Sequence, residues 1–260
     1  MYDMSTRQRA LALVAQGRSL NSVSKEIGIS RAAIRAWQTR IEPLPLMRTQ
    51  AAPCVRCGPE PKPPADAAAY SYLLGLYLGD GCISAGARPG YFLRIACANA
   101  YPGLIDQCTI AMRAINPSGK SGRVQAVGYV SVVAYSRHWP CLFPQHGPGM
   151  KHTRKITLEP WQQEIVDAYP WEFVRGLVHS DGCRVINWTT RLVGSERKRY
   201  EYPRYFFSNK SDCIRQLFTN TLDALGVSWR SCTRNGEAFN ISVARKADVA
   251  RMDDHIGPKY

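Results

Sequence analysis

Residues 73–81 read LLGLYLGDG and residues 174–182 read VRGLVHSDG. The second stretch lies 101 residues after the first, and two glycines, a leucine and an aspartate coincide between them. A cysteine follows each copy, at Cys82 and Cys183, and we expect both to be small buried side chains. Self-similarity at a fixed offset is typical of a duplicated structural unit. The sequence therefore predicts two copies of one unit in a single chain.

Small residues form a stripe along each copy. Gly75 and Gly79 are four positions apart, as are Gly176 and Ser180. Residues i and i+4 of an α-helix share one face, so small side chains there let two helix backbones approach closely. We expect the two copies to be helices that pack against each other through these stripes.

An aspartate ends each expected helix, Asp80 in the first and Asp181 in the second. Packing of the stripes would bring the two carboxylates together, where they repel each other and face the negative helix termini. A divalent cation compensates such a pair, and Mg²⁺ typically binds one or two carboxylates. Metal ions so placed can activate water and stabilise the leaving oxygen of a phosphodiester. A single Asp-Gly would indicate only a turn, whereas two equivalent ones favour a metal site.

The segments that follow the two motifs run in parallel. Each contains two β-rich runs, an amphipathic helix, two further strands, a short helix and a Gly-Pro followed by a lysine. The expected strands and helices are 91–97, 104–115, 122–127 and 129–136 in the first half, and 204–207, 213–225, 227–233 and 238–244 in the second. Each half therefore reads αββαββα, which predicts an α+β fold built from tandem pseudo-symmetric repeats over residues 69–158 and 159–260.

The charge of the chain favours a polyanionic partner. Among 260 residues, 34 are Lys or Arg and 20 are Asp or Glu, which gives a net charge of +14. Residues 1–68 carry +5, residues 69–158 carry +7 and residues 159–260 carry only +2. Nucleic acid is the commonest partner for an excess of this size. The apolar content of 45% excludes a disordered chain, and no apolar run is long enough to span a membrane.

The N-terminal segment, residues 1–45, is expected to fold as a small all-α domain. Its helices are predicted at 6–16, 19–26 and 31–40, and Gly28 makes a tight turn between the last two. Helix, glycine turn and helix form the helix-turn-helix pattern.

The third of these helices is basic and is the expected recognition helix. Recognition helices enter the DNA major groove N-terminus first, so Arg31, Ala32 and Arg35 are the candidates for base contacts. The alternative is a generic three-helix bundle with a solvated basic face. The glycine turn and the basic helix together favour DNA binding.

Residues 46–68 form a proline-rich linker that contains Cys54 and Cys57 in a CxxC pattern. A closed structural zinc site needs four ligands, and no second CxxC or HxxxH lies nearby. The remaining candidates are single residues, Cys97, Cys108 or His138. A structural Zn²⁺ held with distant ligands and no metal at all are both open.

The nine cysteines show no regular disulfide framework, and the N-terminus lacks the pattern of a secretory signal. We therefore expect reduced thiols and a cytoplasmic protein. A DNA partner would make it nucleoid-associated.

The two motifs resemble those of the LAGLIDADG homing endonuclease family, and the resemblance extends over roughly residues 69–260. The matching positions are Leu73, Gly75, Leu76, Asp80 and Gly81 in the first copy and Gly176, Leu177, Asp181 and Gly182 in the second. The family motif has a further acid two residues before the last one. Here that position is Leu78 or His179, and we expect His179 to pack or to support the site and not to bind a metal.

The resemblance implies the fold, the reaction and the site. Two four-stranded sheets would form a saddle over double-stranded DNA, and Mg²⁺ or Mn²⁺ would serve cleavage of both strands. The metals would be bound by Asp80 and Asp181, with the carbonyls of Gly79 and Ser180 as further ligands.

Basic residues near the scissile phosphates are also implied by the resemblance. The candidates for the reaction are Lys151, Arg137 and Lys246, and Lys259 occupies the position of Lys151 in the second half. The candidates for DNA contacts on the strands are Arg94, Arg184 and Arg204.

Two functions fit this sequence. The first is a sequence-specific, metal-dependent, double-strand DNA endonuclease of homing type, which needs both acids. The second is a DNA-binding transcriptional regulator that uses the same saddle without cutting and does not need them. In either case we expect a monomer, because the two repeats supply both halves of a pseudo-dimer.

Overall fold

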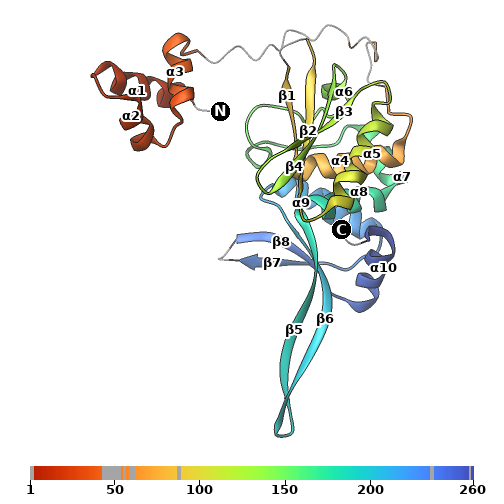
Figure 1. Ribbon diagram of the computed structural model, residues 1–260. Helices are drawn as coiled ribbons and strands as arrows, with labels where there is room; N and C mark the ends of the chain where they lie inside the picture. The colour runs from red at the N-terminus through yellow and green to blue at the C-terminus, as the bar shows by residue number, and fades with distance from the viewer. Residues whose placement is uncertain are drawn as a thin grey trace. The chain divides into compact units, whose positions relative to one another are not determined.

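The computed structural model describes residues 3–42, 54, 57–58, 62–86, 89–234, 237–257 and 259–260. The chain divides into two compact units, Met1–Pro53 and Cys54–Tyr260, and each is described by itself (Figure 1).

The N-terminal unit contains three short helices, α1 (Met4–Ala15), α2 (Leu20–Ile27) and α3 (Arg31–Thr39). Each begins at a side chain that accepts a backbone N–H, which is the ordinary way to satisfy the first turn of a helix. These N-cap residues are Asp3, Ser19 and Ser30. Gly28 ends α2 in the left-handed region at φ 67°, a conformation that glycine adopts without steric cost. The core of this unit consists of Ala10, Val23, Ile29, Ile34 and Trp37.

The second unit contains the two repeats, and its element order is the one that the sequence predicts. The first repeat comprises α4 (Ala67–Asp80), β1 (Gly81–Ala85), β2 (Tyr91–Ala98), α5 (Pro102–Ile115), β3 (Ser121–Gln125), β4 (Tyr129–Ser136) and α6 (Trp139–Leu142). The second comprises α8 (Pro170–Asp181), β5 (Gly182–Val193), β6 (Glu196–Ser208), α9 (Asp212–Ala224), β7 (Arg230–Arg234), β8 (Glu237–Val243) and α10 (Lys246–Ile256). A 3-10 turn, η1 (Lys151–Thr153), and helix α7 (Pro160–Ala168) connect them. The α+β class and the tandem αββαββα order are therefore confirmed.

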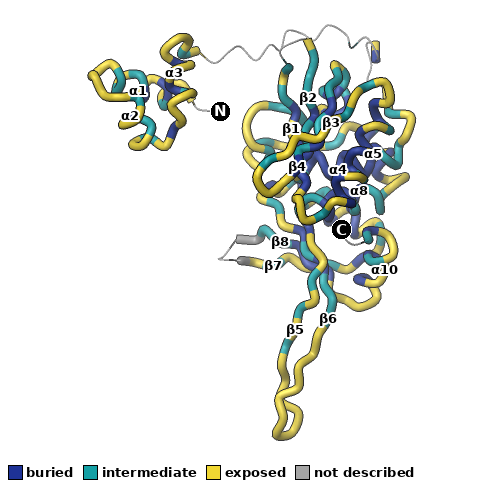
Figure 2. Tube along the Cα trace, in the orientation of Figure 1, coloured by how far each residue is buried: buried dark blue, intermediate teal, exposed yellow. Residues whose placement is uncertain are grey.

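Each repeat forms one antiparallel four-stranded sheet, with the orders β1-β2-β4-β3 and β5-β6-β8-β7. Burial alternates along the strands, as in Leu93, Ile95 and Cys97 of β2. Alternating side chains point to opposite faces of a sheet, so one face packs on the helices and the other faces outward. The second sheet differs in one respect, because β5 and β6 pair as far as Val193 and Glu196. This hairpin extends well beyond the rest of its sheet (Figure 1), and it is exposed along its outer half (Figure 2).

Helices α4 and α8 pack against each other at the centre of the second unit, and α4 is buried from Tyr70 to Leu78 (Figure 2). A Cβ atom added to Gly75 would lie 2.6 Å from the carbonyl oxygen of Phe173. One added to Gly176 would lie 2.2 Å from the carbonyl oxygen of Tyr72. Backbone therefore lies directly against backbone, and the predicted packing of the two small-residue stripes is confirmed.

The prediction for the cysteines after the motifs is wrong. Cys82 and Cys183 are both exposed, because each is the second residue of its strand and faces away from the helices. The next residue of β1, Ile83, takes the buried position instead.

Of the helices in the described residues, none combines the length and the hydropathy needed to cross a membrane.

Candidate active site and nucleic-acid interface

The two aspartates lie where each central helix turns into the first strand of its sheet. Asp80 ends α4 and Asp181 ends α8, and Gly81 and Gly182 follow in extended conformations. A Cβ added to Gly81 would lie 2.5 Å from the Cα of Tyr77. The glycines of the two Asp-Gly pairs are therefore required by the tight passage from helix to strand, which fixes where the carboxylates lie.

The pKa values of the two carboxyl groups are raised together. Burial is the main cause for Asp80, whose pKa rises to about 6, and the charge of Asp181 adds to the rise. Burial also raises the pKa of Asp181, although Asn209 opposes the rise by donating from Nδ2 to Oδ2 at 2.6 Å. Lys151 and Lys259 lower both pKa values. The ends of the central helices therefore form a site where negative charge is incompletely compensated.

Lys151 and Lys259 cap the C-terminal ends of the two central helices in equivalent ways. The Nζ of Lys151 donates to the carbonyl oxygens of Tyr77, Leu78 and Gly79, at 2.5, 3.1 and 3.0 Å. The Nζ of Lys259 donates to those of Ser180 and Gly182, at 3.2 and 2.5 Å. The last carbonyls of a helix lack intrahelical donors and carry partial negative charge, so a cation there stabilises the helix. Burial lowers the pKa of Lys151 to about 8 and also lowers that of Lys259.

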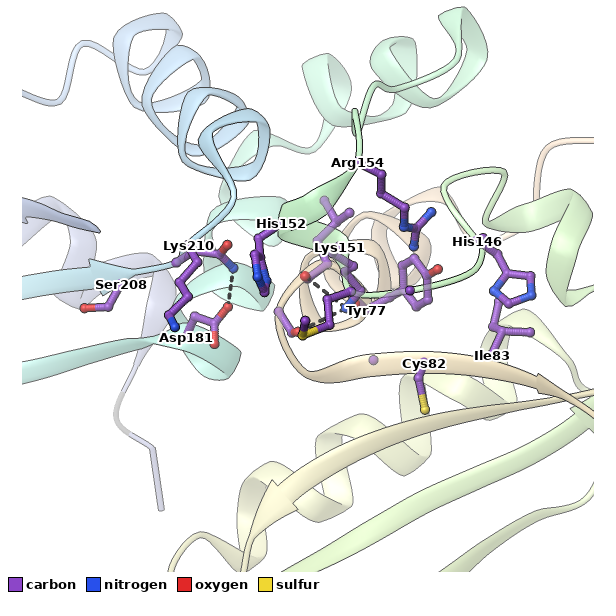
Figure 3. Close-up of a pocket in the computed structure, with 17 residues that line it drawn as sticks. Tyr77, Cys82, Ile83, His146, Lys151, His152, Arg154, Asp181, Ser208 and Lys210 are labelled. Atoms are coloured by element: carbon purple, nitrogen blue, oxygen red, sulfur yellow. Dashed lines mark hydrogen bonds between the residues drawn. The ribbon is translucent and has the colours of Figure 1, made fainter. Parts of the chain in front are cut away.

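A cleft of about 630 Å³ opens beside these helix ends (Figure 3). Its lining includes the backbone of α4 near Gly79, the carboxylate-bearing Asp181 and a group of basic or imidazole side chains. This group comprises His146, Lys151, His152, Arg154 and Lys210. The cleft thus combines the carboxylate of Asp181 with several cations, which suits a polyanionic substrate that approaches this acid. Asp80, at the neighbouring helix end, is not among the residues that line the cleft.

The chemistry of the donor set fits a divalent cation that prefers oxygen ligands. The carboxylates of Asp80 and Asp181 lie beside the carbonyl oxygens of Gly79 and Ser180 on helix ends in contact. Such oxygens are the ligands that Mg²⁺ and Mn²⁺ take in proteins. Burial and the charge of Asp181 raise the pKa of Asp80, while Lys259 and Lys151 lower it, so a bound cation would further stabilise the charged carboxylates.

Two of the basic residues predicted for the reaction lie elsewhere. Arg137 is exposed and donates from Nε to the carbonyl oxygen of Pro89 at 2.8 Å. Lys246 is the exposed first residue of α10. Within the described residues neither lines the cleft, whereas Lys151 does. A sequence pattern distinguishes the two groups of basic residues. Lys151 and Lys259 each follow a Gly-Pro pair, whereas Arg137 and Lys246 do not.

The predicted DNA-contacting arginines of the sheets differ in the face that they occupy. Arg94 donates to Ser84 and stacks on Phe92, with Cζ 4.8 Å from the ring centroid. Arg204 lies 5.5 Å from the rings of both Tyr202 and Phe206. These residues alternate with the buried positions of β2 and β6 and therefore share the outward faces of the two sheets.

Arg184 lies on the opposite, helix-covered face of the second sheet. It pairs across the strands with buried Tyr205, and directly opposed residues share a face. Its guanidinium donates to Asp253 of α10 through Nε at 2.6 Å and Nη2 at 2.8 Å, and the hydroxyl of Tyr205 donates to the same carboxylate. The Asp253 partner raises the pKa of Arg184. The geometry therefore places Arg184 in an ion pair with Asp253, on the face opposite to that of Arg94 and Arg204, and its contact with DNA stays a prediction.

Sequence reasoning missed several residues of the site. Asn209, which holds Asp181, follows β6, and Lys210 lines the cleft next to it. Asn99 occupies the equivalent position after β2, yet its side chain accepts a hydrogen bond from Gln125 at 3.1 Å. The repeated Asn was visible in the sequence, but only the structure distinguishes its two environments.

His179, at the position of the additional family acid, is buried between the central helices and α10. Its Nδ1 lies 3.0 Å from the hydroxyl of Tyr72, and its Nε2 lies 3.2 Å from the carbonyl oxygen of Ile256. Burial lowers the pKa of His179 to about 4. A neutral, hydrogen-bonded histidine in the core agrees with a packing role and not with metal binding.

In the N-terminal unit, Arg31, Ala32 and Arg35 are all exposed on α3, while Ile34 and Trp37 are buried. The three candidates therefore share the solvent side of this helix, where they are free of the core of their own unit.

Comparison with known proteins found solved structures of similar fold. Variants of the homing endonuclease I-DmoI align at a TM-score of 0.47 and 16% identity, over 73% of this chain and 95% of theirs. The LAGLIDADG meganuclease I-AabMI bound to uncleaved DNA aligns at 0.47 and 12%, over 73% of this chain and 84% of that one. The N-terminal LAGLIDADG domain of WhiA aligns at 0.44 and 13%, over 74% of this chain and 83% of that one.

No family model matches the sequence, and no curated protein matches it. At TM-scores of 0.44–0.47 and 12–16% identity, these alignments carry no conclusion about the function of this chain. The strand order and the central helix pair described above establish the architecture of this chain independently.

Proposed function

We propose that this chain is a sequence-specific, divalent-metal-dependent DNA endonuclease that cleaves both strands. The observation that carries the proposal is the pair of aspartates at the ends of two helices whose backbones are in contact. Burial and the neighbouring charge of Asp181 raise the pKa of Asp80 to about 6. Strongly perturbed pKa values cluster at functional sites, and a divalent cation is a partner that two adjacent carboxylates bind.

Four groups of the chain would hold the metal: the carboxylates of Asp80 and Asp181 and the carbonyl oxygens of Gly79 and Ser180. The bound ion would supply an activated water and stabilise charge on the phosphodiester oxygens. Asn209 would keep the Asp181 carboxylate in one orientation through its 2.6 Å hydrogen bond.

The basic lining of the cleft would bind the phosphodiester backbone of the substrate. Lys151 lies at the same helix end as Asp80 and is held there by three carbonyl oxygens. In this position its ammonium would stabilise negative charge on the phosphate that is attacked. Arg154, His152 and Lys210 line the same cleft and would hold the flanking phosphates.

The outward faces of the two sheets are the proposed surface for the DNA duplex. Arg94 and Arg204 lie on these faces, each stacked on aromatic rings that limit its side-chain freedom. The β5–β6 hairpin extends the second face, on which the exposed Arg191 and Lys198 pair across the two strands. This placement of charge accounts for a DNA surface in the half of the chain whose net charge is only +2.

The N-terminal unit would add further base contacts through α3. The proposal is that α2, the turn at Gly28 and α3 act as a helix-turn-helix, with Arg31, Ala32 and Arg35 toward the bases. One chain would act alone, since it carries both aspartates, and it would be found with the nucleoid in the cytoplasm.

The experiment is a cleavage selection on a randomised duplex library with Mg²⁺, followed by cleavage assays on the selected sequence. Asp80→Asn and Asp181→Asn are compared with the wild type, and Asp254→Asn is the matched control because Asp254 is an exposed residue of α10 outside the cleft. We expect the two site variants to retain binding and to lose cleavage by at least ~100-fold.

The alternative, a transcriptional regulator that binds DNA without cutting, predicts a different result. In that case the wild type would select a binding sequence but would cleave nothing with Mg²⁺ or Mn²⁺. Cleavage by wild type that both Asn variants retain would contradict the proposed site while leaving nuclease activity intact.

A further inference from the structure

Four sulfur and nitrogen ligands converge at one edge of the first repeat, outside the cleft. Cys54, Cys57, His138 and Cys141 each offer a ligand atom, and all four atoms lie within 4.8 Å of one another. The Nδ1 of His138 lies 3.3 Å from the Sγ of Cys54 and 3.1 Å from that of Cys57. Ligands on ~2.3 Å bonds to one tetrahedral zinc lie about 3.8 Å apart, so these separations are those of a nearly formed metal site.

Each pair of ligands comes from a tight turn that directs both side chains to the same side. The N–H groups of Cys57 and Gly58 donate to the carbonyl oxygen of Cys54, at 3.0 and 2.8 Å, and Gly58 has a φ of +67°. In the second pair, the N–H of Cys141 donates to the carbonyl oxygen of His138 at 3.0 Å. The two pairs have the same spacing, Cys-x2-Cys and His-x2-Cys, although residues 58–137 separate them in the chain.

The choice of residues identifies the metal. Three thiolates and one imidazole in a closed set of four, with no carboxylate, favour tetrahedral Zn²⁺ over Mg²⁺ or Mn²⁺. Two other sequence candidates are excluded as ligands, since Cys97 and Cys108 are buried within the core of the first repeat. The missing fourth ligand is Cys141, which the sequence alone did not associate with the CxxC.

The position of the cluster suggests what the metal does. Cys54 is the first residue of the second unit. Cys141 belongs to the short helix α6 after β4, and His138 is the N-cap of that helix. A helix of four residues has little stability of its own. The segment that follows α6 leads to His146 and Lys151 in the cleft.

We propose that Cys54, Cys57, His138 and Cys141 bind a structural Zn²⁺ that fastens the start of the second unit to α6. The metal would fix the point at which the chain from the N-terminal unit joins the first repeat. It would also hold α6 at the base of the segment that carries Lys151. This site is separate from the Mg²⁺ or Mn²⁺ site of the proposed function and does not depend on cleavage.

The test is metal analysis of the full-length chain, purified without a polyhistidine tag in a thiol reductant. We expect about one zinc per chain by mass spectrometry, and tetrahedral thiolate absorption bands after exchange with Co²⁺. Cys57→Ser and Cys141→Ser should each weaken zinc binding at least tenfold in competition with a chelator. Cys232→Ser, at a partly buried cysteine on β7, is the control and should bind as the wild type does.

Three results would overturn the proposal. The first is a wild-type chain that contains less than about 0.1 zinc and takes up none on dialysis against Zn²⁺. The second is equal zinc affinity in the wild type and in folded Cys57→Ser and Cys141→Ser chains. The third is a disulfide among Cys54, Cys57 and Cys141 in the reduced preparation. The Co²⁺ spectrum of the wild type decides the matter even if both ligand variants fail to fold.

Discussion

The raised pKa of Asp80 predicts that replacing this residue stabilises the protein when no divalent metal is present. The ordinary pKa of an aspartate is 3.8, and in this site it rises to about 6. The folded state therefore binds the proton more tightly than the unfolded state does. Stability from this group is present at low pH and is lost as the pH rises from about 4 to about 6.

The magnitude follows from the pKa and from the exposure of the residue. Each pKa unit corresponds to about 1.4 kcal/mol, so the full rise would correspond to about 3 kcal/mol at pH 7. Packed surroundings remove part of the hydration of the Asp80 carboxyl group, but the residue as a whole keeps contact with solvent. Screening by water reduces charge effects at such positions. We therefore expect Asp80→Asn to raise the free energy of unfolding at pH 7 by about 1 kcal/mol.

The assay is thermal and urea unfolding of wild type and Asp80→Asn in EDTA, at pH 7 and at pH 4, following the transition of the second unit. At pH 7 the variant should melt about 2–4 °C higher, and at pH 4 the difference should nearly vanish. Addition of Mg²⁺ should stabilise the wild type more than the variant, because the metal binds the folded carboxylates. A variant that is less stable than wild type at pH 7, or a gain that is equal at both pH values, would refute the reasoning.

Three further predictions address the helix pair, the lysine and the sheet faces. Gly176→Ala should destabilise the second unit by about 3 kcal/mol in urea unfolding, because its Cβ would lie 2.2 Å from a backbone carbonyl oxygen. Gly122→Ala has free space and should change stability by less than about 1 kcal/mol. Equal effects of the two changes would contradict the close packing. Cleavage should fall as the pH rises through about 8, where Lys151 loses its charge, and Lys151→Met should abolish this dependence; a rising rate would assign the lysine the role of a base. Arg204→Ala should weaken DNA binding and reduce its salt dependence by about one phosphate contact. Arg184→Ala should chiefly lower stability, because it removes the pair with Asp253. If the faces were assigned wrongly, filter binding at several salt concentrations would show the larger loss of binding for Arg184→Ala.

The repeated motif was sufficient to predict the central part of the fold. Gly75 and Gly176 carry a direct physical signal, because small residues four apart predict a close helix contact whatever surrounds them. Each Asp-Gly pair comes directly after its small-residue stripe, so the aspartate is expected at the C-terminal end of the helix. For these reasons the sequence alone predicts that Asp80 and Asp181 lie at the ends of two helices in contact.

Residues whose role depends on distant partners could not be predicted in the same way. Arg184 is basic and lies on a strand, but its face is decided by Tyr205 across the hairpin and by Asp253 on α10. The first pair of zinc ligands was visible as a CxxC, whereas Cys141 became a candidate only when the fold placed α6 beside it.

The length of the β5–β6 hairpin was also underestimated. The sequence predicted a strand over residues 204–207, but β6 runs from Glu196 to Ser208. Its outer half is a run of charged residues with no alternation of polar and apolar side chains, which is the usual signal of a strand. Pairing with β5 in register supplies the backbone hydrogen bonds that the local pattern does not indicate.

The most direct test of the central claim is the position of Mn²⁺ in crystals of the chain bound to its selected DNA, located by anomalous scattering. The account predicts manganese within coordination distance of the carboxylates of both Asp80 and Asp181, where the C-terminal ends of α4 and α8 meet. Manganese bound away from both carboxylates, in crystals where the DNA is cleaved, would contradict the account.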